Sequence, residues 1–193
     1  MNYIMRTTLP HLTVILICLM SSCAVSGSFQ GLYSYQDRVE ADYPGLVAYA
    51  DDVCAIEPVD STLVYATNGK AIESCFTSGR YLVYLWRPNC SSSVCIAPSR
   101  LQQICDSAGV ELFVVAEYYD GPKFLYPHEL RRPIFAIDGA YYKTRLTARY
   151  TERFKRDLGL PESVIPEHAF LFLFDGGRLR EYGASVEELS ELY

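Results

Sequence analysis

The sequence predicts an α/β fold with a central mixed β-sheet flanked by helices. Tyr81–Trp86 is a continuous run of aliphatic and aromatic residues, the pattern of a strand buried on both faces. A helix is expected after it, and beyond Gly109 a second apolar run, 110–118, predicts another strand. The usual handedness rule makes this a parallel, right-handed unit. Two further expected strands, 169–174 and 178–182, flank a glycine turn and add a hairpin to the sheet.

The first segment has the form of a secretory signal. Arg6 lies in a short polar region, residues 12–20 are apolar, and Ser21 and Ser22 precede Cys23. The apolar run is too short to span a bilayer as a stable helix. Small residues before a cysteine resemble a bacterial lipobox, which implies a signal peptide over 1–22 and lipidation of Cys23, for example with palmitate. An ordinary signal peptide cut nearby and an uncleaved anchor are the alternatives.

Composition indicates one exported globular domain. Residues 23–36 are rich in Ser, Gly and Tyr and are expected to form a flexible spacer, followed by a single domain over 37–193. The lipid on Cys23 would hold this domain at a bacterial membrane, in the periplasm or outside the cell. A net charge of -6 argues against nucleic-acid binding. With three histidines and no zinc-type spacing, neither a metal nor a cofactor is expected.

The region before the buried strand contains a turn signal. Residues 46–50 are interpreted as a short helix. Residues 62–66 and 70–72 flank Thr67-Asn68-Gly69, in which Asn-Gly is a strong hairpin signal. The sequence therefore predicts an N-terminal β-hairpin extension.

Helices alternate with strands in the second half of the chain. The helix from Ile96 places Leu101, Cys105 and two other apolar residues on one face, and Gly121-Pro122 is expected to break the chain. A short helical piece at 128–130, a strand at 133–137 and a closing helix at 187–192 are also expected. A further amphipathic helix has apolar residues every four positions: Tyr142, Leu146, Tyr150, Phe154 and Leu158. Its other face is a solvated surface or a docking surface, and carries Lys143, Arg145, Arg149, Arg153, Lys155 and Arg156.

Seven cysteines are consistent with export. Cys18 lies in the leader. Cys54 and Cys75 flank the expected hairpin and are interpreted as a structural bridge. Cys105, on the core face of its helix, is interpreted as a buried thiol. The domain contains an odd number of cysteines, so at least one thiol stays unpaired or pairs between molecules.

Cys90 is the expected nucleophile. Pro88 ends the buried strand, and Asn89 with the serines after Cys90 supplies turn and N-cap chemistry before the helix. A helix N-terminus stabilises a thiolate and brings a cysteine pKa from ~8.5 into the range ~3.5 to 7.5.

This stretch resembles the active-site segment of the thioredoxin superfamily, especially its bacterial cell-envelope members. Trp86, Cys90 and Pro98 stand at matching positions, and Ile96-Ala97-Pro98 repeats a common tripeptide of that helix. The resemblance runs from about residue 62 to the C-terminus. It implies a thioredoxin-like fold, protein thiols or disulfides as partners, and a substrate site shaped by Trp86 and Pro98.

Two positions depart from the family pattern. Without a gap, the second cysteine of the family falls on Ser93, and Cys95 lies two residues further on. If the helix begins early, Cys90 and Cys95 diverge by about 140° around it. If the serines form a loop ahead of the helix, the two cysteines can close a disulfide. The cis-proline that guides substrate in active thioredoxins corresponds to Ala169, and Pro166 lies three residues earlier.

Three functional hypotheses follow. In the first, Cys90 attacks a substrate disulfide and Cys95 resolves the mixed disulfide. In the second, Cys90 acts alone and traps or isomerises mixed disulfides. In the third, the chain is a redox-inactive thioredoxin-fold lipoprotein that serves as a binding or accessory protein.

Overall fold

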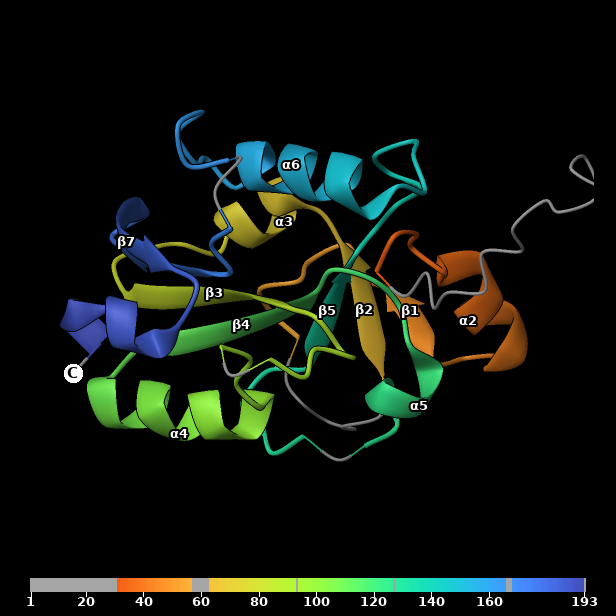
Figure 1. The fold of residues 1–193 in the computed structure, drawn as a ribbon, viewed down its shortest axis with the longest axis horizontal. Coiled ribbons are helices and arrows are strands. Elements are labelled where there is room, and N and C mark those ends of the chain that lie inside the picture. The colour runs from red at the N-terminus through yellow and green to blue at the C-terminus, as the bar shows by residue number, and fades with distance from the viewer. Residues whose placement is uncertain (1–30, 57–62, 93, 127, 166–167, 193) are drawn as a thin grey trace, which may run out of the picture.

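The computed structural model describes residues 31–56, 63–92, 94–126, 128–165 and 168–192. These residues form a seven-stranded mixed sheet in the order β1-β2-β5-β4-β3-β6-β7. Helices α3 and α6 lie over one face of the sheet, and α4 and α5 lie over the other (Figure 1). The predicted α/β class, with a mixed sheet between helices, is confirmed.

The strands are β1 (Val47–Tyr49), β2 (Val64–Thr67), β3 (Arg80–Trp86), β4 (Glu111–Ala116), β5 (Ile134–Ile137), β6 (Leu171–Asp175) and β7 (Arg178–Gly183). The helices are α2 (Gln36–Asp42), α3 (Gly69–Glu73), α4 (Pro98–Ala108), α5 (Gly121–Phe124) and α6 (Thr147–Asp157), followed by the 3-10 turns η1 (Val186–Glu188) and η2 (Ser190–Leu192).

Strand β3 is buried on both faces, as its apolar run predicts. It pairs in parallel with β4 and antiparallel with β6. Leu82 and Trp86 join the hydrophobic core on the α4 side, whereas Val83 and Leu85 join the core on the α6 side. Because burying one such side chain contributes about 1.5–3 kcal/mol, alternate residues of one strand stabilise both layers of helices.

Helix α4 also follows its sequence pattern. Pro98 occupies the first turn, where a missing N–H costs nothing, and Gly109 ends the helix in the left-handed conformation with φ 63°. Leu101 and Cys105, on the face of α4 that packs against the core, are fully buried. Burial raises the pKa of Cys105 to about 12, so this thiol stays protonated, as expected for a buried apolar cysteine.

The predicted N-terminal hairpin is wrong. Strand β2 pairs in parallel with β1 and β5, and the chain turns after it into α3. The Asn68 side chain accepts the Ala71 N–H at 3.0 Å and so caps that helix. A Cβ on Gly69 would overlap the backbone of α6 at Phe154 and Leu158. Asn-Gly therefore serves as a helix cap and a close helix contact, not as a hairpin turn.

Three other local expectations also fail. Residues 46–50 contain strand β1 in place of a helix. Gly121 and Pro122 begin helix α5, capped by the Asp120 side chain, whereas residues 128–130 are not helical. The expected closing helix at 187–192 is present as two short 3-10 turns, η1 and η2. Its buried residues, Val186, Leu189 and Leu192, recur every three positions, which matches the period of a 3-10 helix.

Helix α6 confirms the apolar face of its predicted pattern but not its full length. Tyr150, Phe154 and Leu158 are buried, whereas Tyr142 and Leu146 precede the first turn. Lys155 departs from the expected solvated face, because it is buried and its Nζ donates to the Ile165 carbonyl oxygen at 3.2 Å.

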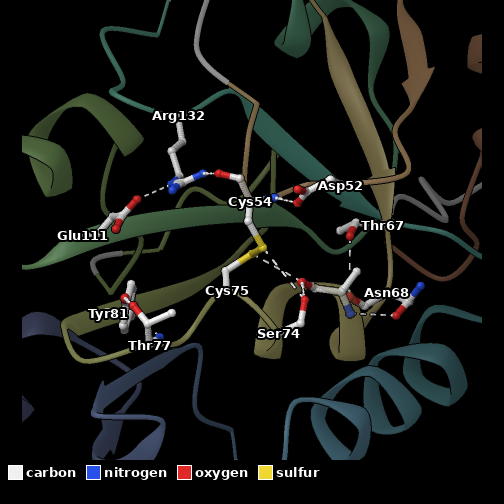
Figure 2. Close-up of a disulfide and its surroundings, with 11 residues drawn as sticks. Asp52, Cys54, Thr67, Asn68, Ser74, Cys75, Thr77, Tyr81, Glu111 and Arg132 are labelled. Carbon is white, nitrogen blue, oxygen red and sulfur yellow. Dashed lines mark hydrogen bonds and ion pairs between the residues drawn. A yellow bond between two sulfur atoms is a disulfide. The ribbon is translucent and has the colours of Figure 1, made fainter.

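Cys54 and Cys75 lie at disulfide distance, as predicted (Figure 2). Their Cα atoms are 5.3 Å apart, and the pair joins the segment after β1 to the end of α3. Arg132 donates to the Cys54 carbonyl oxygen at 3.0 Å and also pairs with Glu111 at the start of β4. The bridge therefore joins the segment before β2 to the segment that follows β2 and α3, and Arg132 links the bridge to β4.

The expected signal peptide and Cys23 lie outside the described residues. Ser34 and Gln36, at the end of the expected spacer, are buried, and the Gln36 side chain donates to the Tyr49 hydroxyl at 2.9 Å. No helix within the described ranges is long and apolar enough to cross a membrane.

Candidate functional site

The two cysteines of the candidate site lie in the loop between β3 and α4. Cys90 and Cys95 are at disulfide distance, with Cα atoms 6.1 Å apart, and each is partly buried. Each closes a turn: the Cys90 N–H donates to the Arg87 carbonyl, and the Cys95 N–H donates to the Ser92 carbonyl. The serine segment therefore forms a loop ahead of the helix, which is the alternative that allows a disulfide between them.

Helix α4 does not reach the cysteines. It begins at Pro98, with Ala97 as its N-cap, so Cys90 lies more than a turn before the helix. Because the dipole effect falls off within the first turn, the expected thiolate stabilisation by the helix N-terminus is wrong. The Ser92 hydroxyl lies 3.6 Å from the Cys90 Sγ and 3.3 Å from the Cys95 Sγ.

Trp86 and Pro98 lie at the two ends of this loop, as the last residue of β3 and the first residue of α4. Trp86 is buried on the α4 face, with its ring centroid 5.2 Å from that of His128. Pro98 is buried at the start of α4. The Tyr84 hydroxyl donates to the Ile96 carbonyl at 3.0 Å, and burial raises the pKa of Tyr84 to about 12, which keeps this donor protonated. This hydrogen bond joins the end of the loop to strand β3.

A pocket of about 540 Å³ borders Cys90 on the opposite, α6 side of the sheet. It lies among the ends of β3 and β4, helix α6 and the segment before β6. Cys90 lines this pocket and Cys95 does not. The polar side chains that share the pocket with Cys90 include Arg87, Glu117, Thr151, Lys155 and His168.

Glu117 is the buried acid of this pocket. Its carboxylate pairs with Arg87, whose guanidinium carbon lies 4.2 Å from the Phe170 ring centroid. Burial raises the pKa of Glu117, and attraction to Arg87 and Lys155 opposes this rise only in part. One pocket is thus lined by a cysteine and by an acid with an elevated pKa.

The segment before β6 lines the same pocket as Cys90, but Ala169 is not one of its lining residues. Ala169 is buried in the α6-side core, whereas its neighbours His168 and Phe170 line the pocket. The described residues contain no cis peptide bond. Pro166 and Ser93 fall outside the described ranges.

Sequence reasoning missed Glu117 and Thr151, and it placed Lys155 on the solvated or docking face of its helix. Glu117 gives a usable signal, because it is a carboxylate inside the apolar run 110–118. Thr151 and Lys155 give none, since an amphipathic helix pattern places both among ordinary polar positions. Only the packing of α6 against the sheet brings them to Cys90.

Comparisons with protein-family models, with curated proteins and with solved structures found no match to this chain. Among the described residues, no group of three His, Cys, Asp or Glu side chains is placed to hold a metal ion.

Proposed function

We propose that this chain is a thioredoxin-like lipoprotein of the cell envelope that exchanges thiols and disulfides through Cys90 and Cys95. One observation carries the proposal. The two cysteines lie at disulfide distance in the loop that leaves a buried strand, and a pocket gives access to Cys90. The alternation β3, α4, β4 and the antiparallel pair β6 and β7 are consistent with the family resemblance.

The reaction moves two electrons. In the reduced protein, the Cys90 thiolate attacks one sulfur of a protein disulfide, forms a mixed disulfide and releases the first substrate thiolate. The Cys95 thiolate then attacks the Cys90 sulfur, closes the Cys90–Cys95 disulfide and releases the second substrate thiolate. The substrate is reduced and the protein is oxidised. The reverse sequence oxidises a substrate dithiol.

Two features of the pocket favour Cys90 as the attacking sulfur. It lines the pocket, whereas Cys95 does not, so a substrate in the pocket meets Cys90 first. Arg87 and Lys155 line the same pocket, and positive charge favours a thiolate. The Ser92 hydroxyl is within hydrogen-bond reach of both sulfurs and can donate to whichever one is ionised.

Site-resolved alkylation in glutathione buffers tests this mechanism. The full chain is equilibrated at graded potentials, alkylated and mapped by peptide mass spectrometry. Cys90 and Cys95 should titrate together as one two-electron couple, and in the reduced protein Cys90 should alkylate well below pH 8. Cys105 is the internal control and should stay unmodified. Cys95→Ser should accumulate mixed disulfides on Cys90, and Cys90→Ser should accumulate none.

A redox-inactive binding protein is the second candidate. The observation that favours it is Ala169 at the position of the family's cis-proline. This candidate predicts that Cys90 and Cys95 do not titrate as a couple and that Cys90→Ser leaves partner binding unchanged.

The lipid anchor is tested separately. Lipidation of Cys23 predicts that a palmitate analogue labels the protein in bacteria, and that Cys23→Ser abolishes the labelling and moves the protein from the membrane fraction. Labelling that persists in Cys23→Ser would contradict the anchor.

A further inference from the structure

The described chain begins at the pocket that borders Cys90. Gly31, the first described residue, lines this pocket, and the Tyr118 ring packs against it. The Tyr118 hydroxyl accepts the backbone N–H of Asn89, the residue before Cys90, at 3.0 Å. Gly31 has φ 84°, and a Cβ there would lie 3.2 Å from a Tyr118 ring carbon, so the position favours glycine. One side chain, Tyr118, thus connects the start of the described chain to the cysteine loop.

Backbone hydrogen bonds fix this starting point to the body of the domain. The Leu32 carbonyl oxygen accepts the Thr147 N–H, at the start of α6, at 3.1 Å. The Ser34 N–H donates to the Arg145 carbonyl oxygen at 2.8 Å, and the Ser34 carbonyl oxygen accepts the Tyr119 N–H at 2.8 Å. The chain upstream of Gly31 is therefore attached at the rim of the Cys90 pocket, and the attachment point cannot shift unless these bonds break.

The chain between Cys23 and this attachment point is short. Gly31 comes eight positions after Cys23. In any conformation, eight residues span at most about 26–29 Å. A domain of about 160 residues has a radius of gyration of about 15 Å, which corresponds to a diameter of roughly 40 Å. A lipid on Cys23 would therefore hold the domain by a tether shorter than the domain is wide, and the end held near the bilayer would be the one with the Cys90 pocket.

We propose that Cys90 acts on a membrane-anchored protein whose reactive sulfur lies within about 30 Å of the bilayer. A tether of this length keeps the pocket and a sulfur at the membrane surface at a high effective concentration. A sulfur far from the bilayer gains nothing from the tether. The proposal rests on the proposed lipid at Cys23, and the exchange step rests on the proposed redox function.

The test uses the lipidated protein, purified from bacterial membranes and placed in phosphatidylcholine vesicles. The vesicles contain a phosphatidylethanolamine that carries a pyridyl disulfide on its amine, which represents a protein disulfide at the membrane surface. The Cys90 thiolate attacks the sulfur on the lipid side and releases pyridine-2-thione. The Cys95 thiolate then attacks the Cys90 sulfur, closes the Cys90–Cys95 disulfide and releases the lipid thiolate, so the reagent is reduced by two electrons. The soluble reference reagent is the same pyridyl disulfide attached to ethanolamine.

A second thiol in the same protein supplies the control for position. Cys95→Ser removes the resolving step and traps the mixed disulfide on Cys90, while Ser107→Cys adds a thiol at the exposed C-terminal end of α4. This end of α4 precedes β4, whose six residues run back to the end of β3 at Trp86 (Figure 1). Six strand residues span about 20 Å, so the added thiol lies about that much further from Gly31 than the cysteine loop does.

Peptide mapping gives, for each thiol, the ratio of labelling by the lipid reagent to labelling by the soluble reagent. The ratio at Cys90 should exceed the ratio at the added thiol about threefold or more, because the tether keeps the Cys90 end at the surface. Thirty Gly/Ser residues inserted between Gln30 and Gly31 would extend by about 27–33 Å and should bring the two ratios within about twofold. The same thirty residues appended to the C-terminus are the matched control and should leave the difference unchanged.

The failures of the proposals differ. Equal ratios at the two thiols, or a difference that the insertion before Gly31 does not reduce, would refute the membrane-held substrate. If Cys90 prefers the lipid reagent but the protein with Cys95 intact never closes the Cys90–Cys95 disulfide, the exchange function is wrong and the position at the membrane stands. If mass spectrometry finds no lipid on Cys23, the anchor and the membrane-held substrate are both wrong, whereas exchange in glutathione buffers is unaffected.

Discussion

Breaking the Cys54–Cys75 bridge should destabilise the chain more than breaking the Cys90–Cys95 pair. Cys54→Ser removes the bridge without shrinking the buried side chain of Cys75. The freed Cys75 thiol keeps a partner, because its Sγ lies 3.3 Å from the Ala71 carbonyl oxygen. The loss therefore reports mainly the cross-link and not a cavity.

The magnitude follows from the length of chain that each bridge closes. The sequence separation is 21 for Cys54–Cys75 and 5 for Cys90–Cys95. In the chain-entropy treatment these loops correspond to about 3 kcal/mol and about 2 kcal/mol of stability at 25 °C. For a domain of this size, about 3 kcal/mol lowers the Tm by about 6–12 °C.

Urea denaturation of the wild type and of each variant, without added reductant, measures the free energy of unfolding. Cys90→Ser is the matched control, because it also breaks one bridge and leaves one unpaired thiol. A loss below about 1 kcal/mol for Cys54→Ser, or a loss smaller than that of Cys90→Ser, would refute this reasoning.

Three further predictions address single groups. Asn68→Ala should lower the free energy of unfolding by about 1 kcal/mol, because it removes the α3 cap, and Asn68→Asp should retain most of it in the same urea assay. Cys105 should resist iodoacetamide at pH 8 in the folded chain and react only in denaturant; peptide mapping that finds it modified without denaturant would contradict its burial. Because burial raises the pKa of Glu117, the folded state binds its proton more tightly than the unfolded state, so stability should fall as pH rises from about 4.3 through the raised pKa. Glu117→Gln should lack this slope in urea denaturation between pH 4 and pH 8, and an identical slope in both proteins would exclude Glu117 as its source.

Local sequence patterns correctly predicted the elements whose residues all meet the same kind of environment. A strand buried on both faces requires an apolar residue at every position, so Tyr81–Trp86 was recognisable without its neighbours. The turn between β6 and β7 was equally clear, because Gly176 and Gly177 both have positive φ. Helix α4 likewise ends at the glycine that its sequence pattern indicates.

Local sequence patterns gave wrong predictions where the conformation of a residue depends on a segment that is distant in the sequence. Asn68-Gly69 has the composition of a hairpin turn, yet Gly69 is required by the backbone of α6, which is far away in the sequence. Whether Cys90 and Cys95 can form a disulfide was also undecided by the sequence, because their spacing allowed either an early helix or a loop. The position of Pro98 at the first turn of α4 decided it.

The sequence by itself therefore determined the α/β class and the buried strands, and it indicated Cys54 and Cys75 as a candidate pair. These follow from the apolar pattern and from cysteine spacing, which depend on nearby residues. Only the tertiary structure decided that Glu117, Thr151 and Lys155 share a pocket with Cys90. They come from β4 and α6, and their chemistry depends on a burial that arises only when the helix packs against the sheet.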